Sequence, residues 1–221
     1  MLDVIEAESG DDPRATIIIL HGLGADGNDF VPIAEELELD AVGPVRFIFP
    51  HAPVMPVTIN GGMRMRAWYD IVGFDADSAQ DETGLRRSAA LVEALLQREK
   101  ERGIPANRIV LAGFSQGCAM ALLTGLRHGE RLAGIAGLSG YLPIAQTTAA
   151  ERAPANADVP IFLAHGTHDE VVALERAEAS RDALNALGYP VEWHEYLIGH
   201  GVHPLEVGEL NDWLVRVLSA P

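Results

Sequence analysis

A single serine lies between two glycines where a predicted strand meets a predicted helix. In GFSQG, Gly113 and Gly117 each stand two residues from Ser115. The apolar run RIVLAG (108–113) predicts a buried strand, and CAMALLTGL (118–126) predicts a helix. A strand that turns directly into a helix crowds the residues two positions either side of the turn, and glycines remove the Cβ atoms that would collide. The spacing is that of the G-x-S-x-G nucleophile elbow, so Ser115 is the predicted nucleophile.

A serine hydroxyl needs two partners to act at neutral pH. A histidine must accept its proton, and a carboxylate must orient that histidine. In this architecture the order along the chain is serine, acid, histidine, with each at the carboxyl end of a strand. Asp169 follows the predicted strand VPIFLAHG (159–166), and His200 follows VEWHEYLI (191–198). We therefore predict that Asp169 orients His200 and that His200 is the general base.

Other side chains compete for these two roles. Glu170 is next to Asp169 in the chain and is the alternative acid. His203, three residues after His200, is the main rival base. His194 lies within a predicted strand, and His168 comes before the last strand and too close to Asp169 in the chain. The order of the elements favours Asp169 and His200 over these alternatives.

A glycine-rich loop is predicted to complete an oxyanion hole. TIIIL (16–20) leads into HGLGADGNDF (21–30). In hydrolases with this elbow, an N–H from the loop after an early strand acts together with the N–H of the residue after the nucleophile. These donors are the backbone N–H groups of Leu23 and Gln116. The same glycines would also suit any tight loop between a strand and a helix.

The elements that must position these residues alternate along the chain. Nearly continuous apolar runs are typical of parallel strands that are covered on both faces, and helical patterns separate them. The alternation predicts one α/β domain over 1–221, with a mostly parallel sheet, helices on both faces and no large lid. Two segments, 50–81 and 141–158, are predicted to be long connections. Strands are predicted at 16–20, 45–49, 108–113, 132–138, 159–166 and 191–198, and helices at 28–38 with Asn28 as N-cap, 82–102, 116–128, 174–187 and 204–219.

Composition limits the partners and the compartment. The chain has 221 residues, 48% of them hydrophobic, which is enough for one buried core. A net charge of -16 opposes binding to nucleic acid or to anionic lipid. No apolar run approaches the roughly 20 residues that span a bilayer, so stable membrane insertion is not expected. A lone cysteine, Cys118, and an acidic N-terminus without signal-peptide features predict a cytoplasmic protein.

Five segments together resemble small bacterial carboxylesterases related to acyl-protein thioesterases, in the phospholipase/carboxylesterase family of the α/β-hydrolase fold. The likeness begins near residue 14, so 1–13 are expected to form a peripheral segment. Two departures stand out: Cys118 replaces an expected glycine, and His203 adds an imidazole after the Gly–His pair. The segments, in the family's order and spacing, are LHGLGADGNDF, FPHAPVMPVTINGGMRMRAWYDI, IVLAGFSQGCAM, HGTHDEVV and YLIGHGVHPLEVGELNDWL.

The resemblance implies a function and a set of site residues. It implies a serine carboxylesterase that hydrolyses short- to medium-chain esters of small molecules through an acyl-enzyme, without metal or cofactor. An acyl-protein thioesterase or lysophospholipase would use the same triad, and a non-catalytic binding or dimerisation module is the alternative from another class. Several relatives are homodimers, so a homodimer is compatible with the resemblance. The implied residues are the triad Ser115, Asp169 and His200, the oxyanion donors Leu23 and Gln116, and the substrate contacts Trp68 and Met65.

Overall fold

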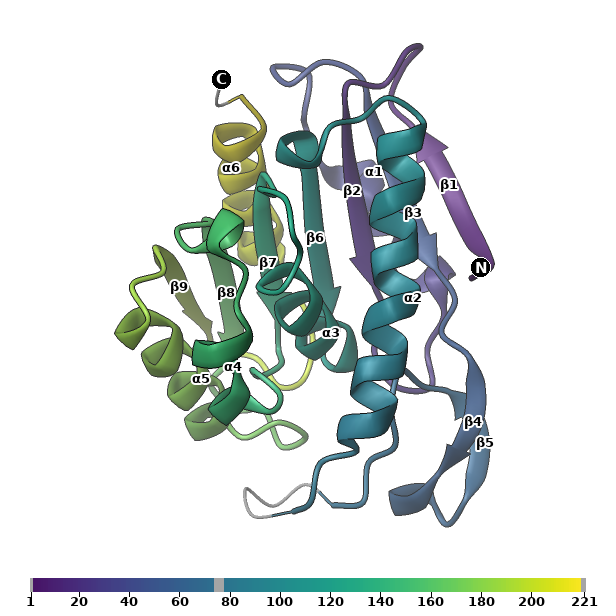
Figure 1. Ribbon diagram of the computed structural model, residues 1–221, viewed down its shortest axis with the longest axis vertical. Helices are drawn as coiled ribbons and strands as arrows, with labels where there is room; N and C mark the ends of the chain where they lie inside the picture. The colour runs from purple at the N-terminus through teal and green to yellow at the C-terminus, as the bar shows by residue number, and fades with distance from the viewer. Residues whose placement is uncertain (1, 74–77, 220–221) are drawn as a thin grey trace.

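A seven-stranded sheet forms the centre of the computed structural model, which describes residues 2–73 and 78–219 (Figure 1). The strand order is β1-β3-β2-β6-β7-β8-β9. Neighbouring strands are parallel except β1, which runs antiparallel to β3. The strands are β1 (Val4–Glu8), β2 (Ala15–Leu20), β3 (Val45–Pro50), β6 (Ile109–Phe114), β7 (Gly134–Leu138), β8 (Ile161–Gly166) and β9 (Val191–Tyr196).

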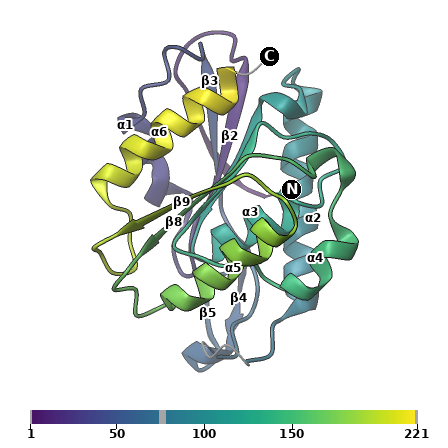
Figure 2. The ribbon, with the colours of Figure 1, turned by 90° about the vertical axis from the view of Figure 1, so that its left-hand side faces the viewer.

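Helices cover both faces of this sheet, as the alternation in the sequence predicts. In the edge-on view, the first and last α-helices of the chain lie on one side of the sheet, and the α-helices between them lie on the other (Figure 2). The first pair is α1 (Val31–Glu36) and α6 (Pro204–Ser219). The opposite layer consists of α2 (Glu82–Glu101), α3 (Gln116–Gly125), α4 (Ala145–Glu151) and α5 (Leu174–Ala186).

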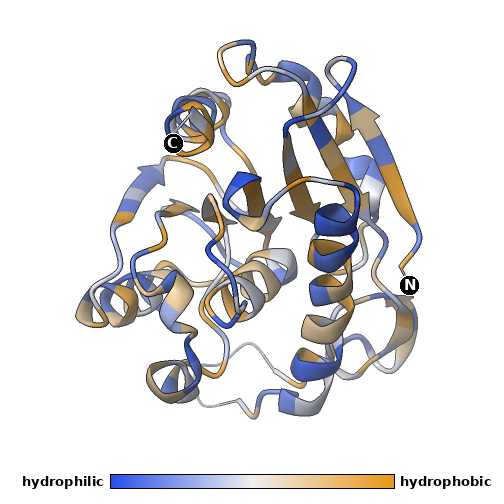
Figure 3. Ribbon diagram, turned by 45° about the horizontal axis from the view of Figure 1, so that its top comes forward, coloured by the Kyte–Doolittle hydropathy of each residue, from blue (hydrophilic) through white to orange (hydrophobic). Residues whose placement is uncertain are grey.

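The central strands are nearly unbroken runs of apolar residues because each of them contributes side chains to two cores, one on each face of the sheet. In β2, Ile18 and Leu20 belong to the core under α2 and α3, whereas Ile17 and Ile19 belong to the core under α1 and α6. Successive side chains of a strand point to opposite faces, so a strand buried on both faces needs apolar residues at every position. The strands accordingly carry the apolar colour at the centre of the molecule, and polar residues gather on the outer helices (Figure 3).

Strands and a helix occur in segments where the sequence predicted none. The segment 1–13, expected to be peripheral, contributes β1 to the edge of the sheet. The predicted connection 50–81 contains a hairpin of β4 (Val54–Val57) and β5 (Met63–Arg66), and 141–158 contains α4. Pro56 and two adjacent glycines obscured the hairpin, because those residues are typical of loops.

The helix predicted at 28–38 is divided and begins earlier than expected. A short 3₁₀ helix, η1 (Gly27–Phe30), comes first, and α1 follows it. The N-cap of η1 is Asp26, whose Oδ1 accepts a hydrogen bond from Asn28 N at 2.8 Å. The prediction of Asn28 as the cap was therefore wrong by two residues. Of the helices in the described ranges, none combines the length and apolar character that crossing a membrane requires.

A buried carboxyl group caps the start of α6. Glu206 is only 1% exposed, and its Oε2 accepts a hydrogen bond from His203 N at 3.0 Å. His203 Nδ1 accepts from Leu205 N at 3.1 Å, so the two side chains cap the first turn reciprocally. Burial raises the pKa of Glu206 from its ordinary 4.5 to about 7. The charged form of this carboxyl is therefore disfavoured in the folded state.

We expect Glu206→Gln to stabilise the protein above neutral pH relative to wild type. The folded wild type binds this proton more tightly than the unfolded chain, so its stability falls as pH rises from about 4.5 to about 7. Glutamine can still accept from His203 N but has no charge to bury. The variant's free energy of unfolding relative to wild type should rise across that window by on the order of 3 kcal/mol. Urea unfolding at pH 5 and pH 8 measures this change, and a pH-independent difference would contradict it.

Candidate active site

Ser115 sits on a strained turn between β6 and α3. Its φ is 56° and its ψ is -117°, a conformation that non-glycine residues rarely adopt. A Cβ added at Gly113 would lie 2.2 Å from the Gly117 carbonyl group, and one at Gly117 would lie 1.9 Å from Leu20 O. The turn is therefore possible only with glycine at both positions. The sequence predicted this arrangement, and the close contacts explain it.

The structure brings Ser115 together with the predicted histidine and acid. His200 Nε2 lies 3.0 Å from Ser115 Oγ, and His200 Nδ1 lies 2.7 Å from Asp169 Oδ2. With the proton on Nδ1, the imidazole donates to the carboxylate and accepts from the hydroxyl. Asp169 Oδ1 accepts two further hydrogen bonds, from Val171 N and Val172 N, both at 2.8 Å. Three hydrogen-bond donors thus compensate for the loss of hydration of the buried carboxylate and fix its orientation.

The competing side chains are engaged elsewhere. The His203 ring stacks on Tyr196, with centroids 5.5 Å apart and planes 7° from parallel. His194 has carboxylates on both ring nitrogens, from Glu192 at 3.1 Å and Glu209 at 2.9 Å. His168 and Glu170 make no contact with the hydroxyl of the elbow in the described part of the chain. Geometry therefore favours the predicted pair over every alternative weighed from the sequence.

The two predicted oxyanion donors come from the loop after β2 and from the start of α3. Gln116 is the first residue of α3, and the first N–H groups of a helix have no partner within it. Leu23 lies on the loop after β2 and lines the same cavity as Ser115. A Cβ added at Gly22 would lie 3.3 Å from Ser115 Cβ, so this loop packs directly against the elbow. Gln116 directly follows Ser115 and Leu23 lies on the loop packed against the elbow, so these two N–H groups remain the predicted oxyanion donors.

An apolar cavity of about 400 Å³ adjoins Ser115 and His200. This volume lies within the roughly 300–1,000 Å³ typical of small-ligand pockets. Phe114 forms part of its wall and also packs on the His200 ring, with centroids 4.8 Å apart. Asp29 also belongs to this lining. The apolar side chains in the wall are Leu23, Phe30, Ile33, Phe114, Val171 and Val202.

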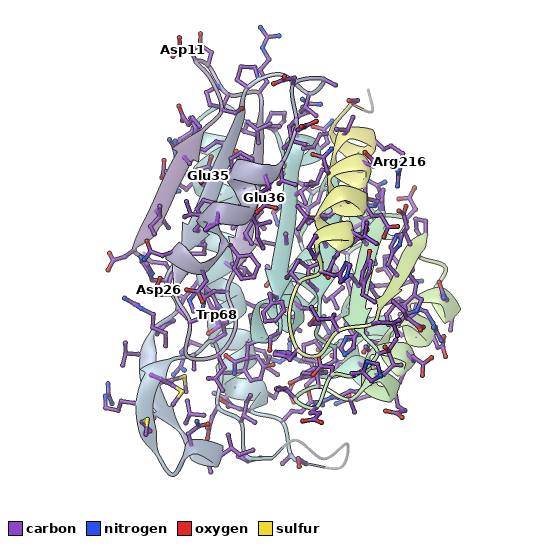
Figure 4. All side chains as sticks on the ribbon, turned by 180° about the vertical axis from the view of Figure 1, so that it is seen from behind. Asp11, Asp26, Glu35, Glu36, Trp68 and Arg216 are labelled. Atoms are coloured by element: carbon purple, nitrogen blue, oxygen red, sulfur yellow. The ribbon has the colours of Figure 1, made fainter. Side chains whose placement is uncertain are left out.

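Trp68, predicted as a substrate contact, lies in the core under α2 and α3. It is fully buried, and its indole Nε1 donates to His21 O at 2.8 Å (Figure 4). Met65 lies beside the glycine loop, where its Sδ would be 3.7 Å from a Cβ added at Gly24. Neither residue lines the cavity next to Ser115. The resemblance to the family suggested Trp68 as a substrate contact, and its burial could not be read from the sequence.

Two further residues near the elbow have structural roles. Ser139 is fully buried with a φ of 48°, and its hydroxyl donates to Gly201 O at 3.2 Å, next to His200. This contact was not predicted from the sequence, although the Ser–Gly pair at the end of a strand was a signal for it. Cys118 is buried, and burial raises its pKa to about 12, so its thiol stays protonated at neutral pH. Among the described residues, no group of His, Cys, Asp and Glu side chains is arranged to hold a metal ion.

Fold and site together define a class of protein. A mostly parallel sheet carries a nucleophile elbow after β6, an acid after β8 and a histidine after β9, which is the arrangement of an α/β hydrolase with a serine nucleophile. The profile of the phospholipase/carboxylesterase family matches residues 3–218. The chain belongs to the phospholipase/carboxylesterase family and is a serine hydrolase. The predicted fold class is confirmed.

The similar proteins refine the family assignment. Acyl-protein thioesterase 1 of Yarrowia lipolytica is 43% identical, over 90% of each chain. The crystal structure of Zea mays acyl-protein thioesterase 2 matches with a TM-score of 0.87 at 33% identity, covering 99% of this chain and 100% of that one. The crystal structure of esterase PE8 matches with a TM-score of 0.81 at 26% sequence identity, and the match covers 98% of each chain. The family expected from the motifs is confirmed, whereas the comparisons do not support the bacterial carboxylesterase branch.

We expect His200→Ala to lower kcat by about 10³-fold or more, as for other triad members. His203→Ala should stay within about tenfold of wild type, because His203 caps α6 and stacks on Tyr196 rather than touching Ser115. Both variants would be assayed with p-nitrophenyl butyrate, and circular dichroism would establish that each is folded. A greater loss of kcat in His203→Ala than in His200→Ala would contradict the assignment of the base.

Proposed function

We propose that this protein is an acyl thioesterase, which removes acyl chains from cysteine thioesters of peptides or proteins, with Ser115 as nucleophile. The observation that carries the proposal is the apolar cavity of about 400 Å³ beside the Ser115 hydroxyl. An acyl chain bonded at that hydroxyl would lie against its aliphatic and aromatic wall. Acyl-protein thioesterases among the similar proteins support the same substrate class.

The reaction follows from the hydrogen bonds of the site. Ser115 Oγ attacks the thioester carbonyl while its proton moves to His200 Nε2. The N–H groups of Leu23 and Gln116 stabilise the oxyanion of the tetrahedral intermediate. Its collapse breaks the carbon–sulfur bond, and the imidazolium protonates the departing sulfur. Water then attacks the acyl-serine by the same steps and releases the carboxylic acid, while Asp169 keeps the imidazole oriented.

The carboxylesterase activity predicted from the sequence is the second candidate. The same triad attacks oxygen esters and thioesters, so the catalytic groups do not select between them. Similarity to esterase PE8 favours retaining this candidate. A non-catalytic module, the third alternative, does not account for the hydrogen-bonded Ser115–His200–Asp169 chain.

We expect a preference for sulfur over oxygen in a matched pair of substrates. One peptide would carry an S-octanoyl cysteine, and the other an O-octanoyl serine at the same position. The kcat/KM of wild type should be at least about tenfold higher for the thioester, and Ser115→Ala should lose about 10³-fold or more on both peptides. Liquid chromatography of the deacylated peptides measures the rates. Faster cleavage of the oxygen ester would instead support the carboxylesterase.

A further inference from the structure

A short buried segment contacts both backbone regions that carry the proposed oxyanion donors. We call residues 66–69 the strap. On one side, Gly24 N donates to Arg66 O at 2.8 Å, and Trp68 Nε1 donates to His21 O at 2.8 Å. These two bonds lie on either side of Leu23, because they hold His21, two residues before it, and Gly24, the residue after it. The strap therefore fixes the loop that presents the Leu23 N–H.

On its other side the strap holds the start of α3. The Gln116 side chain is 2% exposed, and both ends of its amide are bonded to the strap. Its Oε1 accepts from Trp68 N at 3.0 Å, and its Nε2 donates to Tyr69 O at 2.9 Å. The residue whose backbone N–H is the second donor is thus anchored by its own side chain. A planar amide bonded at both ends leaves little freedom to rotate.

The strap itself is fixed to the rest of the protein. Trp68 and Tyr69 are 0% and 2% exposed, and both belong to the core under α2 and α3. The Ser88 hydroxyl in α2 donates to Trp68 O, and Tyr69 Oη lies 2.8 Å from Tyr141 Oη. Ala67 N donates to Pro53 O at 3.0 Å. A segment anchored in this way can act as a rigid reference for its neighbours.

The conformation of the glycine-rich loop depends on contacts with neighbouring segments. Gly24 has a φ of 76°, in the left-handed region that glycine enters freely, so its own backbone does not restrict the loop to one conformation. An oxyanion hole stabilises the transition state only when both donors are already aimed at the developing charge. A loop that rotated one N–H away would leave the triad intact and the oxyanion half-solvated.

We infer that the strap sets the relative position of the two oxyanion N–H groups, with Trp68 and the side chain of Gln116 as positioning residues. The inference rests on the proposed function, because it assigns Leu23 N and Gln116 N to the oxyanion. The strap is bonded to the backbone of the glycine-rich loop, and none of its residues lines the acyl cavity. Weakening it should therefore reduce kcat and leave KM nearly unchanged, since the lost interaction acts in the transition state.

The test compares three variants of the full chain. Trp68→Phe removes the indole N–H and keeps an aromatic ring, and Gln116→Met removes both amide contacts at similar size. Trp213→Phe is the matched control: Trp213 is also buried, at 2% exposure, but it packs on Phe162 in the core under α6. Each variant would be assayed for kcat and KM with the S-octanoyl peptide. Inhibition by an octyl trifluoromethyl ketone, which forms a tetrahedral oxyanion on the serine, would be measured in parallel.

Both strap variants should lower kcat by about tenfold or more, with KM within about threefold of wild type. The inhibition constant of the ketone should rise in proportion, while that of 1-octanol, which has no carbonyl group for the oxyanion hole, should stay unchanged. Trp213→Phe should lower the melting temperature but leave kcat and the inhibition constant of the ketone unchanged. If Trp68→Phe does not fold, Gln116→Met carries the test.

Two results separate failure of the inference from failure of the proposed function. The inference is overturned if wild type is active and depends on Ser115, yet the strap variants match Trp213→Phe in kcat and ketone binding. The proposed function fails instead if wild type and Ser115→Ala are equally inactive on the S-octanoyl peptide and the ketone binds neither protein.

Discussion

The contact between Gly117 and the Leu20 carbonyl is the constraint on which the site depends. The start of α3 approaches β2 so closely that any side chain at Gly117 would collide with that oxygen. This approach forces the turn at Ser115 and ties it to the strand before the glycine-rich loop. Ser115 N also donates to Leu138 O of β7 at 2.9 Å. Three central strands together therefore hold the nucleophile, and no single loop determines its position.

The parallel sheet then supplies the remaining groups from its two outer strands on one side. Asp169 follows β8 and His200 follows β9, so the carboxyl ends of adjacent strands deliver acid and base to the edge where the elbow lies. Ser139, after β7, braces the histidine loop through Gly201 O. The strap, residues 66–69, contacts both the glycine-rich loop and the start of α3. In our inference, this segment sets the relative position of the two oxyanion donors.

Much of this arrangement could be predicted, for identifiable reasons. Most of the strands predicted from the sequence are nearly continuous apolar runs, and Ser115, Asp169 and His200 follow strand ends in the expected order. By contrast, β1 alternates apolar and acidic residues at the sheet edge, and the β4–β5 hairpin contains Pro56 and two glycines, so local composition misled there. Trp68 was predicted as a substrate contact from the resemblance to the family, which does not show whether a side chain is buried. His203 and Cys118, which depart from the family pattern, are a helix cap and a protonated core thiol.

The central claim is that Ser115, activated by His200, forms the covalent intermediate. The most direct measurement treats the protein with p-nitrophenyl octylphosphonate, which phosphonylates an activated serine, and maps the modified peptide by mass spectrometry. We expect one octylphosphonyl group per chain, on Ser115, and no modification of the Ser115→Ala variant. Modification at Cys118, or hydrolytic activity that survives complete phosphonylation of Ser115, would contradict it.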